Sequence, residues 1–256
     1  MPRRGRQKSL RQRSSRRRTR KAQKGGGANV ATEQKTVVLV EPRRHAALEF
    51  LLRNVLENLD TTWSVLLIHG TLNKDYIERI LERLTPKQRQ RITLQSLERS
   101  VLPWAEYNKM LMTKEFYDRI PTEIFLLVQT DSMICPGTQD LLQKFLHYDY
   151  VGAPWRTGGV GNGGFSLRRK SKLLEILEKC PPNPEANEDG FFSAGCAAVK
   201  TSIPSPKEAE EFSIESIYAP RSFGIHKAWH HLPQVNGALE RQCQGYAQLK
   251  SLQKEE

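Results

Sequence analysis

The sequence lacks several features by which common protein classes are recognised. No apolar run reaches about 18 residues, so no membrane-spanning helix is expected. The 4 cysteines include no CxxC pair, which argues against a zinc cluster, and they do not suggest a disulfide scaffold in a chain of 256 residues. Neither a GxSxG element nor a phosphate-binding loop with its lysine is present, which disfavours a hydrolase or a nucleotidyltransferase on a similar sheet.

Acidic residues are missing from the first 24 positions, which hold 12 of the 40 lysines and arginines. The remainder of the chain has equal numbers of basic and acidic residues, so the whole net charge of +12 belongs to this segment. Residues 1–35 also have almost no large apolar side chains and cannot bury enough surface to offset their chain entropy. We therefore expect a disordered basic tail over 1–35 and a single folded domain over 36–256.

The tail also lacks the apolar core of a secretory signal, so reduced thiols in the cytosol or nucleus are expected. Its composition fits a transit peptide, but it has no amphipathic apolar face. The run Arg16–Arg18 is more typical of a nuclear address or a nucleic-acid contact. Nucleic acid or another acidic molecule is thus a candidate partner of residues 1–24, and a solvated arm with no specific partner is the alternative.

Apolar strands alternate with amphipathic helices in the folded region. Continuous apolar runs predict buried strands at 36–40, 64–68 and 123–128, a weaker strand is expected at 92–97, and a strand is also expected at 213–218. Apolar spacing predicts helices at 45–59, 73–84 with Asn73 as cap, 105–120, 138–146, 171–179 with Ser171 as cap, and 237–256. This alternation predicts an α/β fold with a mostly parallel sheet covered by helices on both faces.

Ligands of such sheets bind beyond the carboxyl ends of the strands. Asp131 comes just after the fourth predicted strand and is a candidate site residue, although a turn-forming or helix-capping Asp is the alternative. Arg43 and Arg44 follow the first strand, where either could meet phosphate groups or be a plain surface charge.

Glycine is concentrated in residues 148–168, which contain six. Glycine lets a backbone approach a ligand closely, so the run Gly161, Asn162, Gly163 and Gly164 predicts the wall of a binding site. A pair of tight turns between core strands is the alternative. Trp155 in the same stretch offers a flat face for a sugar ring or an acceptor, or it is a core aromatic.

Two later segments carry candidate polar groups. Glu188 and Asp189 precede a pair of phenylalanines, where they are either acids favoured at the start of a helix or carboxylates held at a cleft wall. His226 belongs to a run of three histidines with His230 and His231 near the chain end, where a histidine is more often a surface or core residue than a ligand.

In their order along the chain, strand-TDS, GAPW, VGNGGFSLR, NEDGFFS and FGIHKAW resemble the GT-A type of nucleotide-sugar glycosyltransferases. The sequence is most similar to a family of glycosyltransferase-like domains without an assigned substrate, over roughly residues 36–232. The hallmarks of that family match Tyr107-Asn108, Gln129–Ser132, Gly152–Trp155 and Gly161–Arg168. The resemblance implies a GT-A-like fold that transfers a sugar from a nucleotide-sugar donor to an acceptor hydroxyl, the acceptor being unknown.

The resemblance also implies a metal site. The Asp-x-Asp motif of that fold binds a divalent metal on the donor phosphates, and it corresponds here to Thr130-Asp131-Ser132 with a single carboxylate. His226 matches the late histidine that many relatives add as a ligand. Mn²⁺ or Mg²⁺ is the implied cofactor, because carboxylate and phosphate oxygens suit both and Mn²⁺ accepts an imidazole.

The catalytic residues implied by the resemblance are Asp189, as the base of an inverting reaction, and Glu188, which would orient the acceptor or a neighbouring amide. The reverse assignment of the two acids stays open. Gly163 and Gly164 would border the sugar, beside Asn162. Because a second Asp is missing from the metal motif, the alternative function is a non-catalytic sugar-nucleotide-fold module that binds nucleic acid or acidic partners through its tail.

Overall fold

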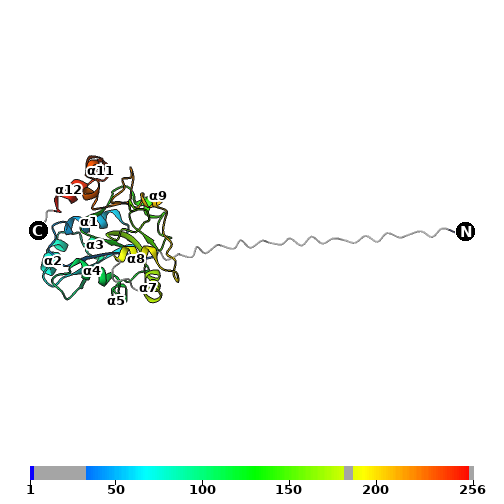
Figure 1. Ribbon diagram of the computed structural model, residues 1–256, viewed down its shortest axis with the longest axis horizontal. Coiled ribbons are helices and arrows are strands. Elements are labelled where there is room, and N and C mark those ends of the chain that lie inside the picture. Colours follow the sequence, from blue (N-terminus) through cyan, green and yellow to red (C-terminus); the bar gives the residue numbers. More distant parts are fainter. Residues whose placement is uncertain (3–32, 182–186, 254–256) are drawn as a thin grey trace. The chain divides into compact units, whose positions relative to one another are not determined.

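The computed structural model describes residues 1–2, 33–181 and 187–253, and most of the predicted basic tail lies outside them. Glu33–Glu256 forms a compact unit (Figure 1). Its strands are β1 (Lys35–Glu41), β2 (Trp63–His69), β3 (Ile92–Ser96), β4 (Ile124–Val128), β5 (Ser132–Ile134), β6 (Tyr150–Val151), β7 (Phe165–Arg169), β8 (Ser213–Ile214) and β9 (Gly224–His226).

The helices of this unit are α1 (Leu48–Asn58), α2 (Lys74–Glu82), α3 (Pro86–Arg89), α4 (Trp104–Leu111), α5 (Lys114–Asp118), α6 (Gln139–Leu142), α7 (Lys170–Lys179), α8 (Glu188–Ala194), α9 (Pro206–Ala209), α10 (Ala228–His231), the 3₁₀ helix η1 (Pro233–Val235), α11 (Asn236–Gln242) and α12 (Tyr246–Ser251). None of the helices in the described ranges has the length and apolar character that crossing a membrane requires.

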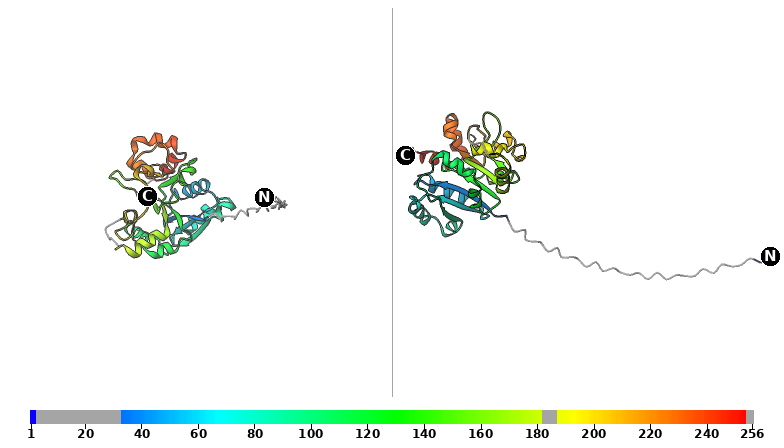
Figure 2. Two further views of the ribbon diagram at one scale, coloured as in Figure 1. Left: turned by 90° about the vertical axis from the view of Figure 1, so that its right-hand side faces the viewer. Right: turned by 60° about the horizontal axis from the view of Figure 1, so that its bottom comes forward.

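The central sheet has the order β3-β2-β1-β4-β7-β6. The strands β1 to β4 are parallel to one another. At one side β7 pairs antiparallel with β4, and β6 pairs antiparallel with β7. Alternate residues of β1 face opposite sides, where one apolar cluster includes α1, α2 and α6 and the other includes α4, α5, α7 and α8 (Figures 1 and 2). The predicted α/β fold, with a mostly parallel sheet covered on both faces, is therefore confirmed.

Several predicted helix boundaries and caps are wrong. The helix predicted at 105–120 is divided into α4 and α5, because the side chain of Thr113 accepts a hydrogen bond from the Phe116 amide and starts a new helix. Asn73 occupies the N-cap position of α2 as predicted, but its side chain makes no capping hydrogen bond, and its amide donates to the carbonyl oxygens of Glu41 and Arg43. Ser171 lies inside α7, where its hydroxyl donates to Glu123.

The segments predicted at 138–146, 213–218 and 237–256 are also shorter or divided. They contain α6, β8, and the two helices α11 and α12, which Gly245 separates with a φ of 99°. Strands of two or three residues carry no hydrophobic periodicity, so a second sheet could not be expected from the sequence. That sheet has the order β5-β9-β8, with β9 antiparallel to β5 and parallel to β8.

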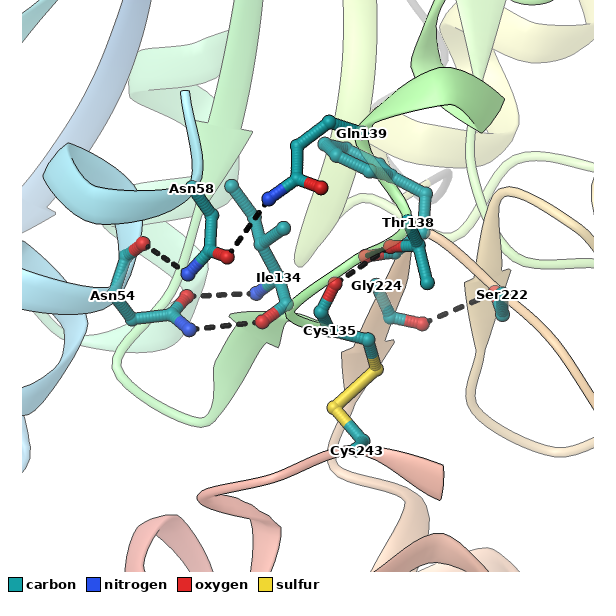
Figure 3. The surroundings of a disulfide bond; sticks show 10 residues. Asn54, Asn58, Ile134, Cys135, Thr138, Gln139, Ser222, Gly224 and Cys243 are labelled. Atoms are coloured by element: carbon teal, nitrogen blue, oxygen red, sulfur yellow. Dashed lines mark hydrogen bonds between the residues drawn. A yellow bond between two sulfur atoms is a disulfide. The ribbon is translucent and has the colours of Figure 1, made fainter. Parts of the chain in front are cut away.

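All four cysteines form disulfides, so the expectation of reduced thiols is wrong. Cys135 after β5 is bonded to Cys243 after α11, and Cys180 after α7 to Cys196 after α8. Figure 3 shows the first bond beside the side chain of Asn54, which forms hydrogen bonds with both backbone groups of Ile134. Disulfides persist in oxidising environments. The cytosolic or nuclear location was predicted from the missing secretory signal and membrane span, and it stays a prediction.

Candidate active site

The predicted metal ligands Asp131 and His226 lie next to each other. The small sheet is the cause, because β5 and β9 pair Ser132 with His226 and so set the histidine beside Asp131, the residue that precedes β5. The Nε2 atom of His226 is 3.3 Å from Oδ1 of Asp131. Both atoms are buried, and neither has a hydrogen-bond partner among the described residues.

The electrostatic environment of this pair shifts both pKa values. Burial would lower the pKa of His226, but the carboxylates of Asp131 and Glu215 outweigh it and raise the pKa to about 9. Burial would raise the pKa of Asp131, but His226 lowers it to about 2.

Glu215 is a site residue that the sequence did not single out. Its Oε1 atom is 3.3 Å from Nδ1 of His226 and accepts a hydrogen bond of 2.8 Å from the side-chain amide of Asn162. Parallel pairing of β8 with β9 matches Ile214 with Ile225. The residues that follow them, Glu215 and His226, therefore lie level with each other. This acid directly after a strand of two residues could have been found only from that register.

Gly163 and Gly164 fit between two charged clusters. A Cβ atom on Gly164 would lie 2.1 Å from Nε2 of His226, and one on Gly163 would lie 2.4 Å from Oε1 of Glu188. The amide of Gly163 donates to Oδ2 of Asp189 at 3.3 Å, and that of Gly164 to the Asn162 side chain at 3.1 Å. The turn thus has the metal-ligand candidates on one side and the acidic pair on the other.

The carboxylate of Glu188 is directed into the protein rather than toward the surface. It accepts two hydrogen bonds, of 2.8 and 2.9 Å, from the guanidinium of Arg168, which is 1% exposed. Arg168 also donates to Ser166 and lies 4.9 Å from the ring of Tyr150. Burial would lower the pKa of Arg168, but Glu188 holds it well above its ordinary value. The sequence did not single out Arg168, which is one of two arginines at the end of β7.

The other predicted binding residues have mixed surroundings. Trp155 is partly exposed, and its ring lies against the backbone of Gly159 and Gly161 in its own turn. Arg43 donates twice to Glu41 at the end of β1, and this carboxylate also accepts from the Thr130 hydroxyl.

Arg44 lies apart from this group and forms an ion pair of 2.8 Å with Asp75 on α2. In the described residues no three His, Cys, Asp or Glu side chains are grouped so that they could hold a metal by themselves. A cavity of about 570 Å³ between α1 and α12, lined by residues such as Phe50, Arg53 and Gln248, contains none of the predicted site residues.

Residues 91–226 match the family described as "Protein of unknown function (DUF5672)", and this is more than half of the chain. The chain belongs to this family. The DUF5672 region contains every predicted site residue except Arg43. No curated protein sequence matches the chain. The finer prediction, a glycosyltransferase-like family defined by the GAPW and GNGGFSLR elements, stays a prediction.

Solved structures share the fold of this DUF5672 protein. An active-site mutant of LgtC has a TM-score of 0.55 at 13% identity, covering 86% of this chain and 97% of that one. Galactosyltransferase LgtC with donor and acceptor sugar analogs gives 0.54 at 12% identity and the same coverage. Mannosyltransferase PcManGT from Pyrobaculum calidifontis, in complex with GDP-Man and Mn²⁺, gives 0.50 at 15% identity over 69% of this chain. At these identities the comparison establishes a GT-A-like fold.

The length of the match differs among these structures. The chain spans 55% of the PcManGT chain, and it spans 54% of glycosyltransferase GlyE from Streptococcus pneumoniae, which gives a TM-score of 0.49 at 13% identity over 75% of this chain. It therefore corresponds to about half the length of these two enzymes.

Proposed function

We propose that the protein transfers a sugar from a nucleotide-sugar donor to an acceptor hydroxyl, with a divalent metal and inversion at the sugar carbon. The observation that carries this proposal is the turn at Gly163 and Gly164, which has Asp131 and His226 on one side and Asp189 on the other. The solved complexes of LgtC with donor and acceptor sugar analogs and of PcManGT with GDP-Man and Mn²⁺ have the same fold.

The pair Asp131 and His226 fits a divalent metal. Its two facing atoms are buried, lack hydrogen-bond partners within the described ranges and are 3.3 Å apart. Neighbouring ligands of an octahedral ion with bonds of about 2.1 Å lie about 3 Å apart. Bound there, Mn²⁺ or Mg²⁺ would neutralise the negative charge that grows on the departing nucleoside diphosphate. Since the protein offers two ligands, donor phosphates and water would supply the rest.

Asp189 is our candidate for the general base. Backbone amides of Gly163 and Gly190 donate to its two oxygens at 3.3 and 2.7 Å, which orients the carboxylate, and its side chain is partly exposed. It would take the proton of the acceptor hydroxyl as that oxygen bonds to the sugar carbon and the bond to the diphosphate breaks. Glu188, bound to Arg168, would hold the start of α8 in place.

The remaining predicted residues would bind substrate indirectly or at the edges. Asn162 shapes the glycine turn, because its amide group bonds both Glu215 and Gly164. Arg43 would lie on the nucleotide side, next to Glu41. Trp155 would offer the exposed part of its ring to a sugar or an acceptor.

Asp189→Asn tests the function. We expect release of nucleoside diphosphate from a panel of nucleotide sugars, with Mn²⁺ present, in the wild type and in Glu57→Gln, a variant at an exposed carboxylate on α1. Asp189→Asn should lose at least about 100-fold of this activity, the usual contribution of a positioned base. It should still show the wild-type rise in melting temperature on donor binding. Full activity of Asp189→Asn would exclude it as the base.

A second function is favoured by the 12 basic residues at positions 1–24. The chain would then bind RNA or another polyanion through this tail, without catalysis or in addition to it. Filter binding of RNA at two salt concentrations, with and without residues 1–24, separates the two functions. RNA binding that is unchanged after the deletion excludes the tail.

A further inference from the structure

His226 is held between two carboxylates that face its two ring nitrogens. Asp131 approaches Nε2 and Glu215 approaches Nδ1, each at 3.3 Å, and neither ring nitrogen has a hydrogen-bond partner among the described residues. The two acids come from opposite neighbours of β9, because β5 pairs with it on one side and β8 on the other. Since Glu215 lies at the far side of the ring, it does not share with Asp131 the position at which Nε2 would bind a cation.

Glu215 is buried, and burying a carboxylate is costly unless other groups satisfy it. Its Oε1 atom accepts from the Asn162 amide at 2.8 Å and lies 3.9 Å from Nε2 of His231. The oxygen of the same Asn162 side chain accepts from the Gly164 amide. One carboxylate therefore contacts both the candidate metal ligand and the residue that shapes the glycine turn.

We propose that Glu215 is a positioning residue that fixes the tautomer of His226. It would accept the Nδ1 proton, so that the Nε2 lone pair is directed toward Asp131 and toward a divalent cation bound there. A histidine that binds a metal commonly donates its other ring proton to a carboxylate, which orients the ring and raises the basicity of the ligand nitrogen. This inference rests on the metal site of the proposed function.

Binding of Mn²⁺ by the full chain tests the proposal without an activity assay. The EPR signal of free Mn²⁺, which is lost on binding, is followed in the presence of inorganic pyrophosphate for the wild type, Glu215→Ala, Glu215→Gln and the control Glu57→Gln. We expect Glu215→Ala to weaken Mn²⁺ binding by about 10- to 100-fold, as the loss of such a partner does elsewhere. Glu215→Gln keeps an oxygen that can accept the Nδ1 proton and should recover part of the affinity.

The outcomes separate this inference from the metal site itself. If Asp131→Asn and His226→Ala lose Mn²⁺ binding while Glu215→Ala binds like Glu57→Gln, the positioning role is wrong and the metal site stands. If the wild type binds no more Mn²⁺ than pyrophosphate alone does, both are wrong.

A second measurement keeps the proposal testable where Glu215→Ala is unstable. Long-range ¹H–¹⁵N NMR spectra of the histidine rings, recorded with Mg²⁺ and pyrophosphate, report which nitrogen carries the proton. We expect the Nδ1–H form for His226 in the wild type and a smaller population of this form in Glu215→Gln, whose neutral oxygen accepts the Nδ1 proton more weakly. An Nε2–H form in the wild type overturns the proposal.

Discussion

The charged clusters on the two sides of the glycine turn differ in whether their buried atoms form hydrogen bonds. Beside Gly163, the carboxylate of Glu188 and the guanidinium of Arg168 are joined by two parallel hydrogen bonds. Beside Gly164, the facing atoms of Asp131 and His226 are also buried but have no hydrogen-bond partner in the described part of the chain. Buried polar atoms in proteins are nearly always satisfied. This difference supports our proposal that the second cluster, unlike the first, binds a ligand.

The largest effect that follows from this comparison is on the satisfied cluster. Arg168→Met leaves Glu188 buried without its cation, and we expect the free energy of unfolding to fall by about 3–5 kcal/mol. Urea denaturation at neutral pH measures this. Arg99→Met is the matched control, because Arg99 is also ion-paired but its side chain is 60% exposed, and it should change stability by less than about 1 kcal/mol.

A double variant sharpens the same prediction. Arg168→Met combined with Glu188→Leu replaces the ion pair by apolar side chains of similar volume, which is often neutral or stabilising. We expect it to recover most of the stability that the single variant loses. If the double variant is as unstable as Arg168→Met, an unpaired charge is not the cause.

The two glycines should show intermediate effects that differ in kind. An added Cβ meets His226 at Gly164 and Glu188 at Gly163, and overpacking of this sort costs about 1–3 kcal/mol. Gly164→Ala should in addition lose Mn²⁺ binding, measured by EPR with pyrophosphate, because the imidazole must move. Gly163→Ala should lose stability while it keeps more of the Mn²⁺ affinity.

The control for both is Gly190→Ala in α8, where a Cβ would meet nothing within 4 Å. Because alanine is the better helix former, this variant should be neutral or slightly more stable. Equal loss of Mn²⁺ binding in Gly163→Ala and Gly164→Ala would mean that the two clusters are not independent.

The central sheet could be predicted from the sequence because its signal is local. The apolar run at 36–40 is found in β1 and that at 123–128 in β4. Every residue of both strands is buried, as a run without polar alternation predicts. The small sheet could not be predicted, because β8 has two residues and its pairing with β9 depends on tertiary contacts. Glu215 was missed for that reason.

The disulfide pairing and the separate roles of the two neighbouring acids could not be predicted from the sequence, because both depend on tertiary packing. Cys135 and Cys243 are 108 residues apart, and cysteine spacing does not determine pairing. Glu188 and Asp189 are neighbours of the same chemistry, and only the position of Arg168 distinguishes them. The sequence located both acids near the glycine turn by resemblance, but which of them faces inward follows from packing.

The smallest effect concerns another carboxylate, Glu49. It binds two arginines, whereas Glu188 binds one, and it is partly exposed. Arg83 and Arg53 donate to it and, with the Arg83 hydrogen bond as the main cause, lower its pKa below the ordinary 4.5. A carboxyl whose pKa is lower in the folded state adds stability above its unfolded pKa, and this stability is lost as the pH falls through the folded value. Since solvent screens the pair, Glu49→Gln should cost less than about 1 kcal/mol at pH 7 and nothing at a pH well below the folded value. Urea denaturation at both pH values checks this. A loss as large as that of Arg168→Met, or one that persists in acid, would mean that burial is not what separates Glu188 from Glu49.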